Sequence, residues 1–306
     1  MKKFLLHIIV YLIIVLLIIL AILIFSSSFV KNKKFKNFET ESNLLVMKEK
    51  EEFDLLFMGI SHARNFSRHK NHIRVEKILN KKIINIGQGN GICGINEQLF
   101  YLDYFYHKKN KASTVIYFIS PPLFFSETLP KSSNTFDYEP FGFSFLFRYF
   151  LFSSENKKER LISYLQTKFA KNWYFHKPYS LNYKKEELTK IDFKVVSEGQ
   201  KMVFKNIIIA EKRFLKSILR VEETIDLALK NKSKVILIIP PALFGKWNGH
   251  NKVKNFAIKM KHNYDVEFYD FSETVLSPKY YYDHHHLNTN GIVFFTTKYL
   301  KPIFRE

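Results

Sequence analysis

The amino-terminal part of the chain is a long run of apolar residues. Between Phe4 and Phe25 only His7 and Tyr11 interrupt it. About 20 apolar residues in a helix span the hydrocarbon core of a bilayer, whereas the apolar core of a cleavable signal peptide has about 7 to 15. We therefore predict an uncleaved transmembrane anchor over residues 1–28.

Lysines flank this segment on both sides. Lys2 and Lys3 precede it, and further lysines follow it in a basic linker that we place at residues 29–50. Under the positive-inside rule the two flanks favour opposite orientations. The charge pattern therefore leaves the orientation of the anchor open.

Beyond the linker, short apolar runs alternate with helical patterns. The apolar runs predict strands at residues 54–60, 82–86, 115–120, 235–239 and 266–271. Helices are expected within 61–79, at about 96–107, 204–230 and 252–262, and from 289 onward. This alternation is typical of a parallel sheet covered on both faces, so we predict an α/β domain over residues 51–306.

The alternation of strand and helix patterns stops between about residues 125 and 202, where the sequence is rich in aromatic and basic residues. A stretch of this length is too long for a loop, so we predict an inserted, mostly helical subdomain. Two interpretations of its aromatic residues are open. They can form a small core, or they can form a lid or a surface against the bilayer, where aromatic and basic residues are both favoured.

Composition narrows the range of partners. The 306 residues carry a formal net charge of +20, which predicts attraction to polyanions such as anionic lipid or acidic cell-wall polymers. The basic residues are spread along the chain without a recognised reader motif, so we do not expect nucleic-acid binding. One cysteine, Cys93, excludes a disulfide framework and a cysteine-built metal site.

Polar clusters stand where predicted strands end or the last helix begins. They are Gly59-Ile60-Ser61-His62, Asn85-Ile86-Gly87, and the run from Asp283 to Asn288. In a doubly wound sheet the carboxyl ends of the strands converge on the ligand site. Together the clusters supply a hydroxyl nucleophile, backbone donors for an oxyanion, and a carboxylate with an imidazole three residues away.

These blocks resemble the SGNH (GDSL-like) hydrolase superfamily, and within it the membrane-anchored bacterial branch of DltD-like and alginate O-acetylation proteins. The matching sequence segments are FDLLFMGISHARNF, IINIGQGNG and YDFSETVLSPKYYYDHHHLNTNGIVFFTTKYL. The last block fits the family pattern D-x-x-H-L-N…G and is the most specific. The resemblance covers about residues 53–300, apart from the insertion, and implies a flavodoxin-like three-layer α/β/α domain.

The resemblance implies a role for each matching residue. Ser61 is the nucleophile, His286 its general base and Asp283 the acid that orients the imidazole. The backbone N–H groups of Ser61 and Gly87 belong to the oxyanion hole. No cofactor and no metal are implied.

Two positions depart from the family pattern. The Asp of the GDS form is Ile60 here, and the G-x-N-D block after the third strand is replaced by the run Ser120-Pro121-Pro122. The asparagine that completes the oxyanion hole is therefore absent. Loss of one such donor costs about 100-fold to 1,000-fold in rate. Asn90 and Ser120 are the candidates to replace it.

Each of these motifs also fits another interpretation. Taken singly, Ser61 fits a helix cap and Asp283 and the glycines fit turns, but their joint order at strand ends favours a site. The segment 89–94 fits G-x-G-x-x-G, yet the next strand ends in prolines instead of the acidic residue that a dinucleotide site needs. A metal site built from Asp283, His62 and the three consecutive histidines 284–286 is disfavoured, because adjacent side chains in an extended segment point to opposite sides.

The resemblance implies a serine esterase or O-acyltransferase acting on acyl esters of a cell-envelope polysaccharide, related polymer or carrier. It implies a single-pass protein of the bacterial cytoplasmic membrane with an extracytoplasmic catalytic domain. A membrane-bound O-acyltransferase is the expected protein partner. The alternative is a non-catalytic accessory or carrier-binding protein of the same kind of pathway.

Overall fold

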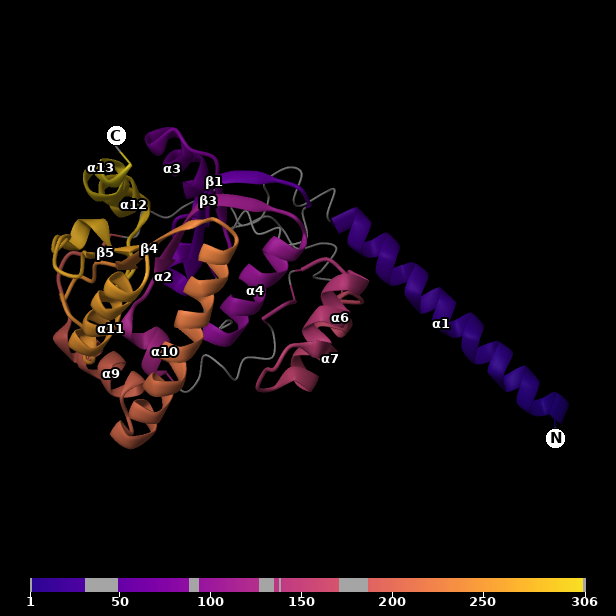
Figure 1. The fold of residues 1–306 in the computed structure, drawn as a ribbon. Helices are drawn as coiled ribbons and strands as arrows, with labels where there is room; N and C mark the ends of the chain where they lie inside the picture. Colours follow the sequence, from indigo (N-terminus) through magenta and orange to yellow (C-terminus); the bar gives the residue numbers. More distant parts are fainter. Residues whose placement is uncertain are drawn as a thin grey trace.

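The structure is a computed structural model that describes residues 2–30, 49–87, 94–126, 135–137, 139–170 and 187–304. Helix α1 (Lys2–Val30) projects from the body of the protein (Figure 1). It is long and apolar enough to cross a membrane, and only 6% of its most apolar window is buried. A helix that is apolar on all sides and so little covered by protein is suited to a lipid environment.

The body is built on a parallel five-stranded sheet. The strands are β1 (Glu52–Gly59), β2 (Ile83–Asn85), β3 (Lys111–Phe118), β4 (Lys234–Ile239) and β5 (Val266–Asp270). Their order is β2-β1-β3-β4-β5, which is the flavodoxin-like order of a doubly wound sheet. The predicted α/β class is confirmed, and each of the five predicted strands is present.

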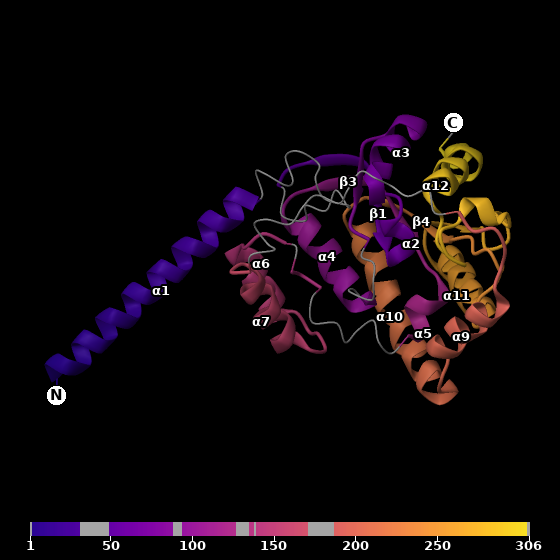
Figure 2. The ribbon, with the colours of Figure 1, turned by 180° about the vertical axis from the view of Figure 1, so that it is seen from behind.

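Helices cover both faces of the sheet (Figures 1 and 2). One face packs against α4 (Ile95–His107), α10 (Ile207–Lys230) and α11 (His250–Asn263). The other packs against α2 (Ser61–Arg64), α3 (Asn71–Leu79) and α12 (Thr289–Phe295). Strands buried on both faces need apolar side chains at nearly every position, which is why the strands could be located as short continuous runs.

Short elements complete the body. They are η2 (Arg68–Lys70), α5 (Pro121–Phe125), η4 (Pro278–Tyr280), η5 (Thr296–Leu300) and α13 (Lys301–Ile303). The described part of the predicted insertion contains α6 (Phe143–Leu151), α7 (Lys157–Thr167) and α9 (Phe193–Val203). These elements are helical, as the sequence predicts for this segment.

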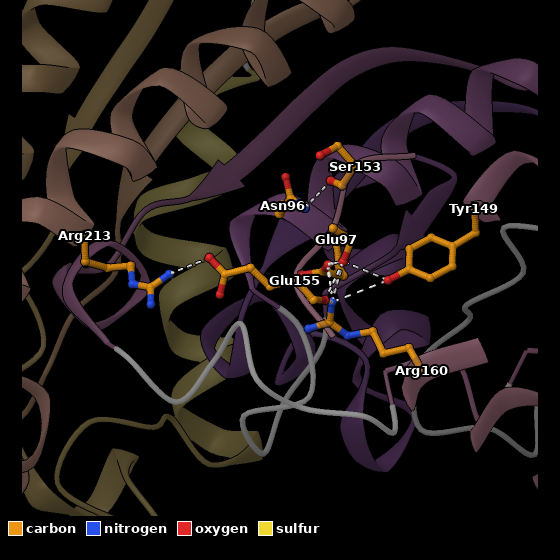
Figure 3. A network of polar contacts seen from close by, with 8 residues as sticks. Asn96, Glu97, Tyr149, Ser153, Glu155, Arg160 and Arg213 are labelled. Carbon is orange, nitrogen blue, oxygen red and sulfur yellow. Dashed lines mark hydrogen bonds and ion pairs between the residues drawn. The ribbon is translucent and has the colours of Figure 1, made fainter. Parts of the chain in front are cut away.

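A buried ion pair joins the insertion to the sheet-covering helix α4 (Figure 3). Arg160 Nη1 lies 2.6 Å from Glu97 Oε1, and both side chains are fully buried. Ser154 Oγ also donates to Glu97 Oε1, at 2.6 Å. Because an unpaired buried charge is costly, this pair fixes how α7 sits on α4.

Candidate active site

Ser61 stands where β1 turns into α2. The turn needs Gly59, which has φ +139°, and a Cβ there would lie 2.8 Å from the Phe118 carbonyl oxygen of the neighbouring strand. Ser61 is then the first residue of α2. Backbone N–H groups in a first helical turn have no intrahelical acceptor, so the Ser61 N–H is available for an external oxygen.

The structure brings Ser61, His286 and Asp283 together. Ser61 Oγ lies 2.6 Å from His286 Nε2, and His286 Nδ1 lies 2.6 Å from Asp283 Oδ2. An ionised carboxylate can only accept hydrogen bonds, so Nδ1 carries the imidazole proton. Nε2 is then the acceptor for the hydroxyl of Ser61. This is the hydrogen-bond relay that a serine nucleophile requires.

A tight loop holds the acid and the base. Tyr281 and Leu287 form an antiparallel bridge across it, and Asp283 Oδ1 accepts the backbone N–H groups of His285 and His286 at 2.9 and 2.8 Å. The carboxylate is therefore oriented by its own loop. One oxygen is committed to the backbone and the other to the imidazole.

Two residues of the D-x-x-H-L-N…G pattern have structural roles here. The Asn288 side chain accepts the N–H of Gly291 at 2.9 Å and so caps α12, and its Nδ2 donates to the Lys279 carbonyl at 2.9 Å. A Cβ at Gly291 would lie 2.1 Å from the Tyr280 carbonyl oxygen. Asn288 and Gly291 thus seat the loop against the helix that follows it.

Tyr282 supports the imidazole from one side. Its ring lies nearly parallel to that of His286, with centroids 5.4 Å apart, and its hydroxyl accepts from Arg68 Nη1 at 3.0 Å. The same hydroxyl lies 3.4 Å from Asn65 Oδ1. Asn65 and Tyr282 lie within the matching sequence blocks, but the sequence does not indicate these contacts, because those of Tyr282 with Arg68 and Asn65 join positions more than 200 residues apart.

The electrostatic environment favours a charged acid beside neutral imidazoles. Burial would raise the pKa of Asp283, but the hydrogen bond and charge of His286, together with His285, hold it well below its usual range. Burial, followed by the charge of His286, lowers the pKa of His285 to about 3. Burial also holds the pKa of His62 well below its ordinary value. His62 and His285 are therefore neutral near pH 7, and Asp283 is ionised.

The rings of His285 and His286 lie side by side, with centroids 3.9 Å apart, so the expectation that adjacent histidines point to opposite sides is wrong for this pair. His284 Nε2 accepts the N–H of Asp192 at 2.9 Å, whereas the His285 ring lies 5.3 Å from that of Trp247. Ligand atoms of Asp283, His285 and His286 do lie within 4.8 Å of one another, a spacing that could hold a metal ion. However, the 2.6 Å contact between His286 and Asp283 is a hydrogen-bond distance, and a bound metal would displace that proton.

The expectation for Gly87 needs correction. Its N–H donates to Asn85 Oδ1 at 2.8 Å, so this donor is already used within the protein. Asn85 Nδ2 in turn donates to the Ala63 carbonyl at 2.7 Å. A Cβ at Gly87 would lie 2.6 Å from that of Ala63. Asn85 and Gly87 therefore position the helix that begins with Ser61.

Ser120 lies at the same level of the sheet as Ser61. Gly59 of β1 pairs with Phe118 of β3, and each serine stands two residues after its paired position. Ser120 is 1% exposed, and its Oγ has no hydrogen-bond partner among the residues that the structure describes. The other candidate donor, Asn90, and most of the G-x-G-x-x-G segment lie outside those residues.

Comparisons with known proteins find distant likenesses among solved structures. No protein-family model matches the sequence, and no curated protein matches it. Among solved structures, a Bacteroides fragilis protein described as an acylhydrolase is 11% identical with a TM-score of 0.39, over 90% of this chain and 97% of that one. A GDSL-like lipase from Bacteroides thetaiotaomicron is 14% identical with a TM-score of 0.39, over 90% and 98%. Likenesses this distant assign no activity.

Proposed function

We propose that the protein is a membrane-anchored serine enzyme that cleaves or transfers acyl esters. The observation that carries this proposal is the continuous relay from Ser61 Oγ through His286 to Asp283, with both contacts at 2.6 Å. A serine hydroxyl is a weak nucleophile until a neighbouring base removes its proton. Hydrogen-bond distances from Ser61 to His286 and from His286 to Asp283 support these roles for the base and for the acid that orients it.

In the proposed reaction Ser61 Oγ attacks the acyl carbonyl carbon, and its proton passes to His286 Nε2. Asp283 stabilises the imidazolium that results. When the tetrahedral intermediate collapses, His286 returns the proton to the leaving oxygen, and the acyl group stays on Ser61. Water or an acceptor hydroxyl then repeats these steps in reverse, which gives hydrolysis or transfer.

The oxyanion needs donors from the same edge of the sheet. We propose the Ser61 N–H as one oxyanion donor and the Ser120 hydroxyl as a second. Ser120 is buried beside the end of β1, and its Oγ has no hydrogen-bond partner among the described residues. Removal of one oxyanion donor costs about 100-fold to 1,000-fold in kcat. Ser120→Ala should therefore lower kcat strongly while Ser61 stays reactive. An unchanged kcat would leave Asn90 as the candidate.

The proposed substrate is an acylated cell-envelope polymer or its carrier. This assignment rests on the resemblance to the anchored SGNH branch and on the apolar helix α1. We propose an extracytoplasmic catalytic domain that works with a membrane-bound O-acyltransferase. Alkaline phosphatase fused after Glu51 should be active in a bacterial host. Inactive fusions, with an active cytoplasmic reporter at the same point, would reverse the orientation.

A non-catalytic accessory role is the second candidate. It is favoured by the absence of the asparagine of the G-x-N-D block, which would complete an oxyanion hole. It is also favoured by the Gly87 N–H, which already donates to Asn85. Turnover of p-nitrophenyl acetate by the purified full chain distinguishes the two. Turnover that Ser61→Ala abolishes supports the enzyme, whereas no turnover by wild-type protein supports the accessory.

A further inference from the structure

Helix α6 presents a row of large apolar side chains to solvent. Phe143, Phe147, Phe150 and Leu151 are 55 to 66% exposed, and their spacing places them on one face of the helix. The opposite face is different, since Phe145 and Tyr149 are fully buried in the main core. The helix is therefore apolar on both sides, and within the described part of the chain only one side is covered by protein.

The end of α1 fixes where this exposed face lies. Leu23, Ser26, Ser27 and Val30 are the residues of α1 buried against protein. Ser27 Oγ accepts the backbone N–H of Phe141 at 2.8 Å, and α6 begins two residues later. Figures 1 and 2 both show α6 and α7 on the side of the body next to α1.

The length of α1 sets the level of the membrane surface. At about 1.5 Å per residue, its 29 residues extend roughly 43 Å, whereas the hydrocarbon core is about 30 Å thick. The last turns of α1, which hold the buried contacts, therefore lie in the headgroup region. The start of α6 is attached to the same turns.

Cationic groups accompany the apolar row. Lys157 Nζ donates to the Phe150 carbonyl at 2.8 Å and lies 5.9 Å from the centre of its ring. Lys158, the next residue of α7, is exposed. Aromatic side chains with neighbouring lysines are the composition of helices that lie in a membrane interface.

The position of α6 is rigidly linked to the catalytic body. Tyr149 lies within 5 Å of the ring centre of Phe100 on α4, and the buried pair of Arg160 and Glu97 holds the adjoining α7 to α4 (Figure 3). A surface that binds α6 therefore also fixes the orientation of the sheet that carries Ser61.

We propose that the exposed face of α6 lies in the headgroup and acyl boundary of the same bilayer that holds α1, as a second membrane contact. This inference rests on the anchor in the proposed function. With two contacts, α1 and α6, the catalytic body has one orientation relative to the membrane instead of rotating about the linker. The occupant of the face is lipid, not a second protein.

Spin labels in the full chain test this proposal, with vesicles of phosphatidylcholine and phosphatidylglycerol. The native thiol is removed by Cys93→Ser, and single labels are placed by Phe147→Cys and, independently, by Phe143→Cys. Ile14→Cys in α1 reports the anchor. Leu276→Cys, exposed after β5, is the water-facing control. Accessibility to oxygen, which concentrates in lipid, is compared with accessibility to a water-soluble nickel complex.

The labels at 147 and 143 are expected to favour oxygen over nickel, at a depth of about 5 to 10 Å, while the label at 276 favours nickel. Labels at 147 and 143 that behave like the one at 276 would overturn the proposal. Labels shielded from both reagents would also overturn it and indicate protein as the occupant. A water-exposed label at 14 would instead refute the anchor itself, and the α6 contact with it.

Discussion

Ser61 Oγ and His286 Nε2 lie 2.6 Å apart, although 225 positions separate the two residues in the chain. The parallel sheet explains the contact. Ser61 follows β1 directly, and the loop that carries His286 comes after β5, so both stand beyond the carboxyl ends of strands. A relay with this geometry leads to specific expectations for the residues that build and support it.

Asp283→Asn is expected to abolish most activity without unfolding the protein. Oδ1 of Asp283 accepts two backbone N–H groups, so the asparagine oxygen must take that place and its NH₂ must face His286 Nδ1. The imidazole proton then moves to Nε2, which can no longer accept from Ser61. A loss on the order of 10⁴-fold in kcat follows, measured with an activated acyl ester. A loss below about tenfold would show that another group orients the imidazole.

His285→Gln is expected to reduce the sensitivity of the fold to acid. The pKa of His285 is about 3 in the folded chain and about 6.5 in an unfolded one. Between these values the unfolded chain binds a proton that the folded chain excludes, so stability falls as the pH drops from about 6.5 toward 3. The variant should show a shallower fall in Tm over this range. His262→Gln, which removes an exposed imidazole, is the control and should follow the wild type.

Gly87→Ala is expected to lower activity by displacing α2. The new methyl would lie 2.6 Å from the Ala63 Cβ and 2.9 Å from the Arg64 nitrogen, so the helix that begins with Ser61 must shift. A displacement of about 1 Å in a catalytic group costs on the order of 100-fold. Gly199→Ala is the matched control, because nothing lies within 4 Å of its Cβ position. Equal kcat values for the two variants would contradict the role of Gly87 in placing Ser61.

Arg160→Met is expected to destabilise the fold strongly. It leaves the carboxylate of Glu97 buried without its cation, at a cost of about 3 to 5 kcal/mol in the free energy of unfolding. Asp226→Asn is the control, because it removes the exposed pair with Lys230, which contributes about 1 kcal/mol or less. Denaturant midpoints measure both changes. The double variant Glu97→Gln with Arg160→Met should recover part of the loss, and no recovery would show that the two charges are not coupled.

Much of the fold was predictable from local pattern. Burial on both faces leaves strands such as residues 235–239 as plain apolar runs, and helices such as α10 keep their amphipathic period. The loop that carries Asp283 and His286 was identifiable because its residues are close in sequence. Because Ser61 and Ser120 each follow a predicted strand, the sequence also predicts that they lie at the same edge of the sheet.

The rest depends on contacts between distant residues. The bond from the Gly87 N–H to Asn85 Oδ1 is local, because an asparagine side chain commonly accepts from the backbone two residues on. The contact that the sequence does not indicate is the one from Asn85 Nδ2 to the Ala63 carbonyl on α2. The support of His286 by Tyr282 and Arg68 likewise depends on how η2 packs on the last loop. Sequence periodicity reports which face of an element is buried, but not which polar partner it meets there.

Covalent labelling of Ser61 tests the central claim most directly. The full chain in detergent is incubated with a fluorophosphonate probe at neutral pH, and the labelled peptide is identified by mass spectrometry. We expect one labelled residue, Ser61, and no labelling of Ser61→Ala or His286→Ala, although both variants keep the wild-type Tm within a few degrees. Wild-type protein that stays unlabelled, or a Ser61→Ala variant that labels as fast as wild type, would contradict a serine nucleophile at this site.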